Sequence, residues 1–254
     1  MKELIKKIIF FVVYYSGLST IYRVLTPGRY RIICYHRFDK EFKNSVLSVS
    51  LVTLKKQLNY LNKCYQPVTL KALMTDFNIS HRSRIALTID DGDCGLKDAW
   101  LIFQQANIKP TLFLAFNLVG QNSYLNHYDL NDLVGRGLNV ESHTLSHPHL
   151  SELKSERAEV EISLSKKKIQ SLIGKTVDYF AYPYGKYQDY TNTNLEQVKK
   201  AGYQAAFTIE EGTIRKSDDI WQLRRIVVFD EPMFMFKVRV SGIIDDVINY
   251  FQSK

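Results

Sequence analysis

Short apolar stretches alternate with amphipathic stretches along most of the chain. The apolar stretches are rich in β-branched and aromatic residues, which is typical of buried strands. They lie at residues 29–38, 84–90, 111–116, 138–142, 177–185, 203–209 and 223–229. The amphipathic stretches repeat apolar residues at helical spacing and so predict helices. They lie at residues 51–63, 68–74, 97–107, 128–137, 151–174, 195–202 and 232–252.

Local signals define two of these helices more closely. In 151–174, Val160, Leu164 and Ile169 mark the predicted apolar face, and Gly174 is predicted to end the helix. Thr69 is the predicted cap of the helix at 68–74.

The alternation predicts the fold class. Strands and helices that alternate with short connections form parallel βα units. The chain has no dinucleotide-binding glycine fingerprint, so an open doubly wound sheet is disfavoured. We therefore predict an α/β fold, a distorted (β/α) barrel of the TIM type with about seven βα units.

The N-terminal residues predict a separate element. Three lysines precede residues 8–22, which carry no charge, and Arg23 ends the run. A spanning helix needs about 20 apolar residues, and no convincing signal-cleavage pattern follows. We predict that residues 1–28 form a membrane-associated helix at the bilayer interface, ending at Pro27-Gly28. The alternative is a helix packed on the protein's own core. Residues 29–254 are then the main domain.

Charge and cysteine content restrict the partners. The 254 residues carry a formal net charge of +8, which favours anionic surfaces such as membrane headgroups or acidic glycans. The basic residues are scattered without a stripe interleaved with aromatics, so nucleic acid is not an expected partner. Cys34, Cys64 and Cys94 give no disulfide framework and no CxxC metal pair. Free thiols favour a reducing compartment, and the side of the membrane stays open.

Two motifs carry candidate chemistry. Residues 88–92 read TIDDG, which places two carboxylates where a buried strand ends. Such charges are costly unless a cation neutralises them. His143 and His147 stand four apart after another strand, and on one helical turn they would face the same ion. One aspartate plus two histidines would hold a metal, leaving the other aspartate as a base. The alternatives are a helix-capping acidic pair and a solvated loop with spare histidines.

These motifs resemble a known family. TIDDG, SHTLSHPHL and YPYG occur in the order and spacing of the polysaccharide deacetylases, the NodB-homology carbohydrate esterases. The resemblance covers roughly residues 30–250. The segment CYHR at 34–37 is most similar to the branch that deacetylates poly-N-acetylglucosamine.

The resemblance implies a role for each matching residue. Asp90 would be the general base, and Asp91, His143 and His147 would bind one divalent metal. Zinc is expected first, with cobalt, nickel or iron as alternatives. Metal-bound water would attack the acetamide carbonyl. The oxyanion would be held by the metal and by a backbone N–H near Tyr184, in the turn formed with Pro183 and Gly185.

The chain also departs from the family pattern. Ala181 stands where many members have the arginine that orients the catalytic acid, and Leu223-Arg224-Arg225 lacks the histidine that protonates the leaving amine. His36 is the candidate replacement acid; the alternatives are that His36 is structural and that Asp90 returns its own proton.

Six further positions complete the predictions. Arg225, with Arg224, would bind an anionic group of the substrate or be structural. Trp221 would stack on a sugar ring or lie in the core. His149 is expected near the site, and His81 and His127 on the surface.

The expected function is a metal-dependent deacetylase that hydrolyses N-acetyl groups of an amino-sugar polysaccharide. One alternative is deacetylation or deformylation of a lipid-linked sugar. Another is a catalytically silent carbohydrate-binding member of the fold, because the arginine and the late histidine are missing. The partners would be the glycan and a membrane surface; the oligomeric state stays open.

Overall fold

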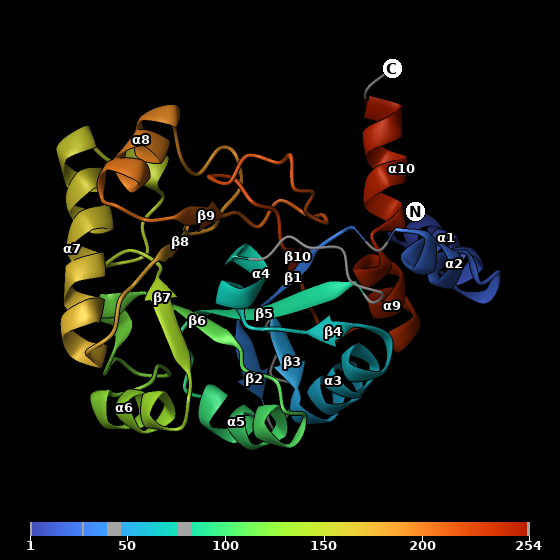
Figure 1. Cartoon of the computed structure of the whole chain (residues 1–254), viewed down its shortest axis with the longest axis horizontal. Helices are drawn as coiled ribbons and strands as arrows, with labels where there is room; N and C mark the ends of the chain where they lie inside the picture. The colour runs from blue at the N-terminus through green and yellow to red at the C-terminus, as the bar shows by residue number, and fades with distance from the viewer. Residues whose placement is uncertain (1, 27, 40–46, 76–82, 253–254) are drawn as a thin grey trace.

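The fold is a parallel sheet that curls into a partial barrel (Figure 1). The computed structural model describes residues 2–26, 28–39, 47–75 and 83–252. The main strands are β1 (Arg31–Tyr35), β5 (Arg84–Asp91), β6 (Thr111–Leu114), β7 (Asn139–Ser142), β8 (Tyr179–Ala181), β9 (Ala205–Phe207) and β10 (Ile226–Val227). Their order is β10-β1-β5-β6-β7-β8-β9, and one parallel bridge between Phe207 and Leu223 links β9 to the residues before β10. The predicted distorted (β/α) barrel is confirmed.

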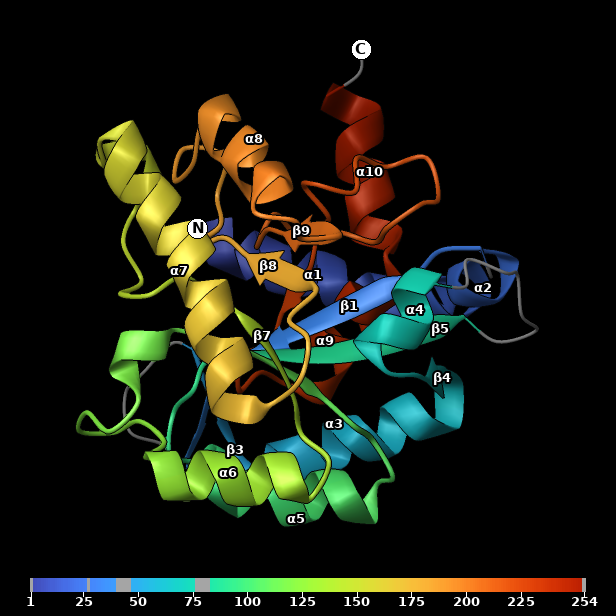
Figure 2. The same cartoon turned by 60° about the vertical axis from the view of Figure 1, so that its left-hand side comes forward.

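Helices cover the outside of the barrel (Figures 1 and 2). They are α3 (Leu51–Cys64), α5 (Leu96–Gln105), α6 (His127–Gly135), α7 (Ser155–Ile173), α8 (Asn192–Lys200), α9 (Met233–Ser241) and α10 (Ile243–Gln252). The short helix α4 (Leu70–Thr75) instead packs Leu70 and Leu73 against the apolar cluster inside the barrel. The short 3-10 helices η1 (Phe116–Leu118) and η2 (Leu150–Glu152) follow β6 and β7. Strand β4 (Gln66–Pro67) pairs with β5, and β2 (Arg37–Asp39) pairs with β3 (Ser48–Ser50). The predicted cap is present, since the Thr69 hydroxyl accepts from the Ala72 N–H at 3.2 Å.

Side-chain alternation along the strands creates two cores and the floor of the site. On β5, Ile85, Leu87 and Ile89 join the core between sheet and helices, whereas Ala86 joins the cluster inside the barrel. Because side chains alternate between the two faces of a strand, Thr88 and Asp90 continue the inner row. The parallel register also pairs Asp90 with Phe113 on β6. Polar side chains at the carboxyl ends of neighbouring strands therefore meet above an apolar barrel interior.

Several predicted elements are shorter in the structure. The strand predicted at 29–38 stops at Tyr35, and Arg37 begins the separate strand β2. The helix predicted at 232–252 is two helices, because Gly242 adopts φ 83° between them. Strand pairing needs a partner across the sheet, and a single-sequence pattern does not contain that information.

The predicted apolar face of the helix at 151–174 was wrong. Val160 and Leu164 are exposed, whereas Ile162 and Glu161 on α7 are fully buried; Ile169 is buried as expected. The reason is a polar requirement. The Glu161 carboxylate accepts hydrogen bonds from the N–H groups of Leu145 and Ser146, at 3.0 and 2.9 Å. The helix turns this acid inward to hold a loop, and Gly174 ends it with φ 65° as predicted.

Two helices precede the barrel. Helix α1 (Lys2–Tyr15) and helix α2 (Leu18–Leu25) are bent by 70° at residues 16–17, and they pack beside α9 (Figure 1). Within the described residues, no single helix has the length and hydropathy to cross a membrane; this bent pair meets both criteria only when taken together. Gly28 is described and Pro27 is not, so the predicted Pro-Gly boundary falls partly outside the described residues, as does His81. His127 is exposed as expected.

Candidate active site

The acidic pair divides at the end of β5. Asp90 is buried on the inner face of the barrel, and Asp91, the last strand residue, adopts φ 73°. This left-handed backbone redirects the Asp91 side chain away from the strand alternation. Gly92 follows with φ 102°, and a Cβ there would lie 2.9 Å from Leu114 Cδ1. The turn thus aims two adjacent carboxylates at different neighbours.

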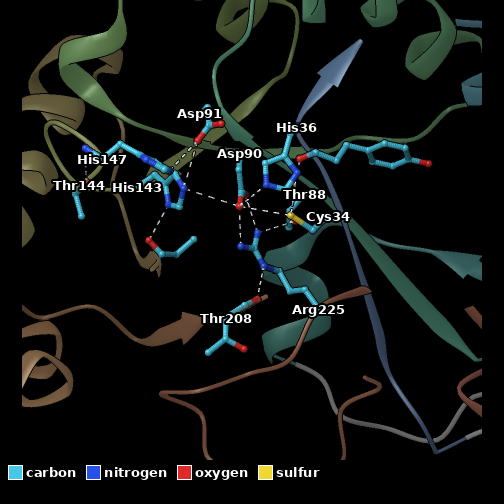
Figure 3. A network of polar contacts seen from close by, with 12 residues as sticks. Cys34, His36, Thr88, Asp90, Asp91, His143, Thr144, His147, Thr208 and Arg225 are labelled. Carbon is cyan, nitrogen blue, oxygen red and sulfur yellow. Dashed lines mark hydrogen bonds and ion pairs between the residues drawn. The ribbon is translucent and has the colours of Figure 1, made fainter. Parts of the chain in front are cut away.

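Asp91 meets the two histidines (Figure 3). Its Oδ1 lies 3.5 Å from His143 Nε2 and 3.2 Å from His147 Nε2, yet this buried oxygen makes no hydrogen bond of acceptable geometry in the described structure. His143 Nδ1 lies 2.8 Å from the Ala181 carbonyl oxygen, which fixes Nδ1 as donor and leaves the Nε2 lone pair free. Three ligand atoms converge without satisfying one another, as expected of residues that hold a metal ion.

The pKa shifts in this cluster indicate that a cation is favoured there. Burial lowers the pKa of His143, but Asp90 and Asp91 raise it more, so that its pKa lies above the ordinary value. Burial raises the pKa of Asp91, but His143 and His147 lower it well below the ordinary value. Both shifts show that positive charge is favoured between these side chains. A divalent ion would supply that charge in place of a proton.

The histidines come from a loop and not from a helix, which corrects the expected geometry. Thr144 and His147 adopt φ 69° and 60°, and the Thr144 hydroxyl accepts from the His147 N–H at 3.1 Å. Glu161 holds the intervening residues from below, through the Leu145 and Ser146 N–H groups. The spacing of four residues therefore brings the two imidazoles together through a tight turn. The centres of their rings lie 4.8 Å apart.

Asp90 is paired with an arginine that comes from β10's side of the barrel (Figure 3). The two terminal nitrogens of Arg225 donate to Oδ1 and Oδ2 of Asp90, both at 2.7 Å. Arg225 also donates to Thr88 Oγ1 at 3.1 Å and to the Thr208 carbonyl at 2.8 Å. Burial would raise the pKa of Asp90, but Arg225 first, then His143 and His36, keep its pKa below the ordinary value. Asp90 is therefore held as an oriented carboxylate.

Arg225 was predicted to contact the substrate or to be structural, and the structure places it inside the protein against Asp90. Its side chain is fully buried, and its guanidinium is occupied by Asp90, Thr88 and Thr208. The neighbouring Ala181 lies in the apolar cluster inside the barrel, at the position where the family pattern has an arginine. The positive charge beside Asp90 thus comes from the residue that precedes β10. The pairing of Arg225 with Asp90 could not be predicted from the sequence, because 135 positions separate the two residues.

A second group of potential ligands surrounds Asp90. Cys34 Sγ lies 3.4 Å from Asp90 Oδ2 and 4.0 Å from His36 Nδ1, and all three residues are buried. Here the carboxylate already has its counter-charge in Arg225, whereas Asp91 has none. Burial raises the pKa of the Cys34 thiol well above its ordinary value, which disfavours the thiolate that metals bind. The set of Asp91, His143 and His147 therefore fits a metal better.

His36 lies at the carboxyl end of β1, facing the same space. Its Nε2 is 3.9 Å from Asp90 Oδ2. Burial lowers the pKa of His36 more than Asp90 and Asp91 raise it. This imidazole is therefore neutral at pH 7. It lies close to Asp90, but in its neutral form it is a poor proton donor.

The Pro183-Tyr184-Gly185 turn lies across from the histidines. Tyr184 adopts φ 58° and is exposed between buried neighbours. Its ring stacks on His149 at 3.6 Å and lies 4.7 Å from the His147 ring. The Tyr184 N–H donates no hydrogen bond to any described residue. A Cβ on Gly185 would lie 2.8 Å from Ile209 N, so this turn requires glycine there.

Two other predicted neighbours are now placed. His149 Nδ1 lies 3.0 Å from Asp189 Oδ1, and this contact orients the imidazole ring on which Tyr184 stacks. Trp221 is partly buried against the main core, and its carbonyl accepts from the Tyr182 hydroxyl at 3.2 Å. The core alternative describes Trp221 better than an open stacking surface.

Comparison with known proteins agrees with these features. The polysaccharide deacetylase family model matches residues 78–206, about half of the chain. The chain belongs to the polysaccharide deacetylase family. This match spans both the acidic pair and the histidine loop.

Individual relatives extend the likeness. The putative polysaccharide deacetylase YxkH of Bacillus subtilis is 25% identical over 207 residues, covering 80% of this chain and 72% of that protein. The poly-beta-1,6-N-acetyl-D-glucosamine N-deacetylase of Staphylococcus epidermidis is 24% identical over 227 residues, covering 82% and 73%. The deacetylase PplD of Streptococcus pyogenes has a similar fold, with a TM-score of 0.75, 20% identity and coverage of 84% of this chain and 99% of PplD. The expected family, and its branch with poly-N-acetylglucosamine deacetylases among the relatives, are confirmed.

The cluster geometry predicts which side chains bind metal. Asp91→Ala, His143→Ala and His147→Ala should each lower the affinity for Zn²⁺ at least about 100-fold, because each removes one of three convergent ligands. Bound metal is measured by elemental analysis after dialysis against a weak chelator. Cys34→Ala is the control and should keep one ion per chain. Full retention by all three ligand variants would reject the assignment.

The Arg225–Asp90 pair predicts a positioning effect. Arg225→Lys should lower kcat about 10- to 100-fold, because an ammonium group cannot bond both carboxylate oxygens in one plane. Bound metal should stay unchanged. The acidic limb of the kcat/KM profile should move to higher pH, because weaker pairing raises the pKa of Asp90. Arg31→Lys, another fully buried arginine, is the control; it should cost stability without moving that limb. An unmoved limb in Arg225→Lys would remove Arg225 from this role.

Proposed function

We propose that the protein is a metal-dependent amide hydrolase that removes N-acetyl groups from an amino-sugar polysaccharide. One observation carries the proposal. A buried three-residue ligand set, Asp91 with His143 and His147, lies beside a carboxylate, Asp90, that has its own cation in Arg225. A silent carbohydrate-binding domain would have no need for both groups.

Asp91, His143 and His147 would hold the metal. Imidazole and carboxylate ligands suit zinc first, with cobalt, nickel and iron as alternatives. When bound, a divalent ion there supplies a Lewis acid that polarises the acetamide carbonyl and makes water a stronger acid at neutral pH. The rest of the chemistry comes from the protein.

Asp90 is the base in this proposal. Its Oδ2 lies 3.9 Å from His143 Nε2, so it faces the ligand set while Arg225 holds it ionised. It takes a proton from the attacking water as the water oxygen bonds to the carbonyl carbon. The Tyr184 N–H, which has no partner among the described residues, donates to the oxygen that becomes negative.

The leaving amine needs that proton back. When the carbon–nitrogen bond breaks, protonated Asp90 returns its proton to the nitrogen, and acetate and a free amino sugar result. His36 is the other candidate acid, but its lowered pKa leaves it neutral. The route through Asp90 is therefore preferred.

The substrate class comes from the family. The chain belongs to a polysaccharide deacetylase family, and relatives are named for poly-beta-1,6-N-acetyl-D-glucosamine. That glycan is the first candidate. A lipid-linked amino sugar is the second, because the N-terminal helices expose apolar surface. Acetate release from β-1,6-linked N-acetylglucosamine oligomers, chito-oligosaccharides and lipid-linked N-acetylglucosamine separates these candidates.

The catalytic proposal makes one decisive prediction. Asp90→Asn should keep its metal and lose turnover by about 100- to 10,000-fold, because an amide accepts no proton. Acetate release on the preferred member of the panel measures the loss. Asp132→Asn, at an exposed position on α6, is the matched control and should remain fully active. Unchanged acetate release by the metal-loaded Asp90→Asn protein would exclude Asp90 as the base.

We further propose that α1 and α2 attach the enzyme to a membrane surface. On α2, four apolar side chains point outward, whereas the polar Ser19 is buried and Arg23 turns inward to bond the Cys64 carbonyl at 2.7 Å. The outward residues are Leu18, Ile21, Val24 and Leu25. This is the reverse of an ordinary surface helix. A water-facing apolar stripe of this kind marks a binding surface.

Helix α1 continues the same apolar surface. Its inner residue Phe10 packs with Met235 and Val238 on α9, while five apolar residues are exposed in residues 7–15, the part of α1 whose side chains the structure describes. These are Ile8, Ile9, Phe11, Val12 and Tyr15. The exposed Lys7 and the net charge of +8 complement anionic headgroups. Apolar and aromatic residues beside lysine suit helices that lie in the bilayer interface.

Point variants test this attachment without uncovering α9. Ile21→Glu/Val24→Glu should lower binding to phosphatidylglycerol-containing vesicles at least about 10-fold, because two charges would enter an apolar region. Co-sedimentation measures the binding. Val52→Glu is the matched control, since Val52 is 66% exposed and Val24 62%. Equal vesicle binding by the double variant and the wild type would disprove the attachment.

A further inference from the structure

Cys34, His36 and Asp90 form a second group of potential ligands beside the first (Figure 3). Cys34 and His36 are two and four residues after Ile32, which belongs to the apolar cluster inside the barrel. Side-chain alternation therefore places both on the inner face. Strands β1 and β5 are paired, with Cys34 opposite Thr88, so the inner row of β5 brings Asp90 next to them. Strand pairing thus sets the three side chains together.

The spacing of this group suits one ion. Cys34 Sγ lies 3.4 Å from Asp90 Oδ2 and 4.0 Å from His36 Nδ1, and His36 Nε2 lies 3.9 Å from Asp90 Oδ2. Donor atoms that each lie about 2.0–2.3 Å from one ion stand roughly 3.3–4.0 Å from one another. One ligand atom from each of the three residues lies within 4.8 Å of the other two. A single ion therefore reaches all three after small side-chain adjustments.

The buried imidazole of His36 has little else to bind. His36 is 9% exposed and Cys34 is fully buried. Among the described residues, neither ring nitrogen of His36 makes a shorter hydrogen bond or ion pair than the two contacts above. Buried polar groups normally have a close partner. An imidazole held at this distance from a thiol and a carboxylate therefore points to a ligand between them.

The sulfur atom selects the kind of ion. Thiolate and imidazole ligands favour soft ions such as copper(I), whereas the set of Asp91, His143 and His147 contains no sulfur. Burial holds the pKa of the Cys34 thiol well above its ordinary value, so the thiol carries its proton at pH 7. Only an ion with a strong preference for sulfur displaces that proton. Zinc and a softer ion would therefore go to different groups.

The charge balance selects a monovalent ion. Arg225 already neutralises Asp90. A monovalent cation that replaces the thiol proton leaves the net charge of the group unchanged, whereas a divalent cation would add a charge next to the guanidinium. Each carboxylate oxygen has two lone pairs, so Asp90 Oδ2 can accept from Arg225 and bind the ion at once.

We propose that Cys34, His36 and Asp90 form a site for a monovalent soft cation of the copper(I) class, and that its occupation stops the reaction. The sulfur–copper bond forms as the thiol proton leaves to solvent, and no electron is transferred. The ion engages Asp90 Oδ2, so Asp90 no longer accepts a proton from water. The binding site rests on geometry alone, whereas the inhibition rests on the proposed function.

The first test counts bound copper. The parent protein is the full chain with Cys64→Ala and Cys94→Ala, in which Cys34 is the only cysteine. It is loaded with zinc and titrated, without oxygen, with copper(I) from a weak complex. We expect one copper and one zinc per chain by elemental analysis. Adding Cys34→Ser should weaken copper binding at least about 100-fold and keep the zinc, because a hydroxyl is a poor ligand for a soft ion.

The second test measures acetate release by the same two proteins. Copper should slow the parent at least about 10-fold, because the ion occupies an oxygen of the candidate base. The protein that also carries Cys34→Ser should keep its own copper-free rate. Because each protein is compared with itself, any effect of the serine on the copper-free rate does not enter.

Three results contradict the proposal. Equal copper binding with and without Cys34 excludes the site, and loss of zinc on copper addition places copper at the other ligand set. Copper that binds through Cys34 without slowing acetate release rejects the inhibition. If the copper-free proteins release no acetate from any glycan, the proposed function fails, and the copper counts still decide the binding site.

Discussion

A carboxylate deep inside a barrel depends on the cation that faces it, and here that cation is Arg225. The pair is bidentate at 2.7 Å and both side chains are buried. Removing one partner of such a pair costs about 3–5 kcal/mol, because the other charge is left buried and alone. Strand β10 pairs with β1 over only two residues, so this ionic contact also helps to close the barrel. The Asp90–Arg225 pair thus both positions the candidate base and helps to close the barrel.

Asp91, the adjacent carboxylate, has no such permanent cation beside it. Asp91 faces two imidazoles and no permanent cation, and its buried Oδ1 has no hydrogen bond in the described structure. The difference arises from one residue of chain, because Asp90 follows the strand alternation and Asp91 turns away at φ 73°. The side chains of this cluster favour positive charge between them, and the proposed metal would supply it. Glu161 and the Ala181 carbonyl hold the histidines ready for it.

The fold and the convergence of the candidate ligands were within reach of the sequence. Apolar runs placed the strands, and shared strand ends placed Asp90, Asp91, His143 and His147 at one mouth. The inward turn of Glu161 was missed, because the periodicity of α7 was judged from apolar residues and the buried face includes an acid. The pairing of Arg225 with Asp90 was missed for another reason. It depends on which side chain the closing strand points into the barrel, and no local pattern near Asp90 records that.

The Arg225 pairing also bears on whether this chain is a silent member of its family. Two departures from the family pattern raised that alternative: alanine at position 181 and no histidine after Leu223. The first departure loses its force, because a guanidinium reaches the same carboxylate from residue 225, and the small Ala181 side chain lies inside the barrel. The second concerns only proton return, which Asp90 can perform once it has accepted a proton. The positive charge beside Asp90 is present in this chain, although it comes from a different sequence position than in the family pattern. This supports an active hydrolase over a binding module.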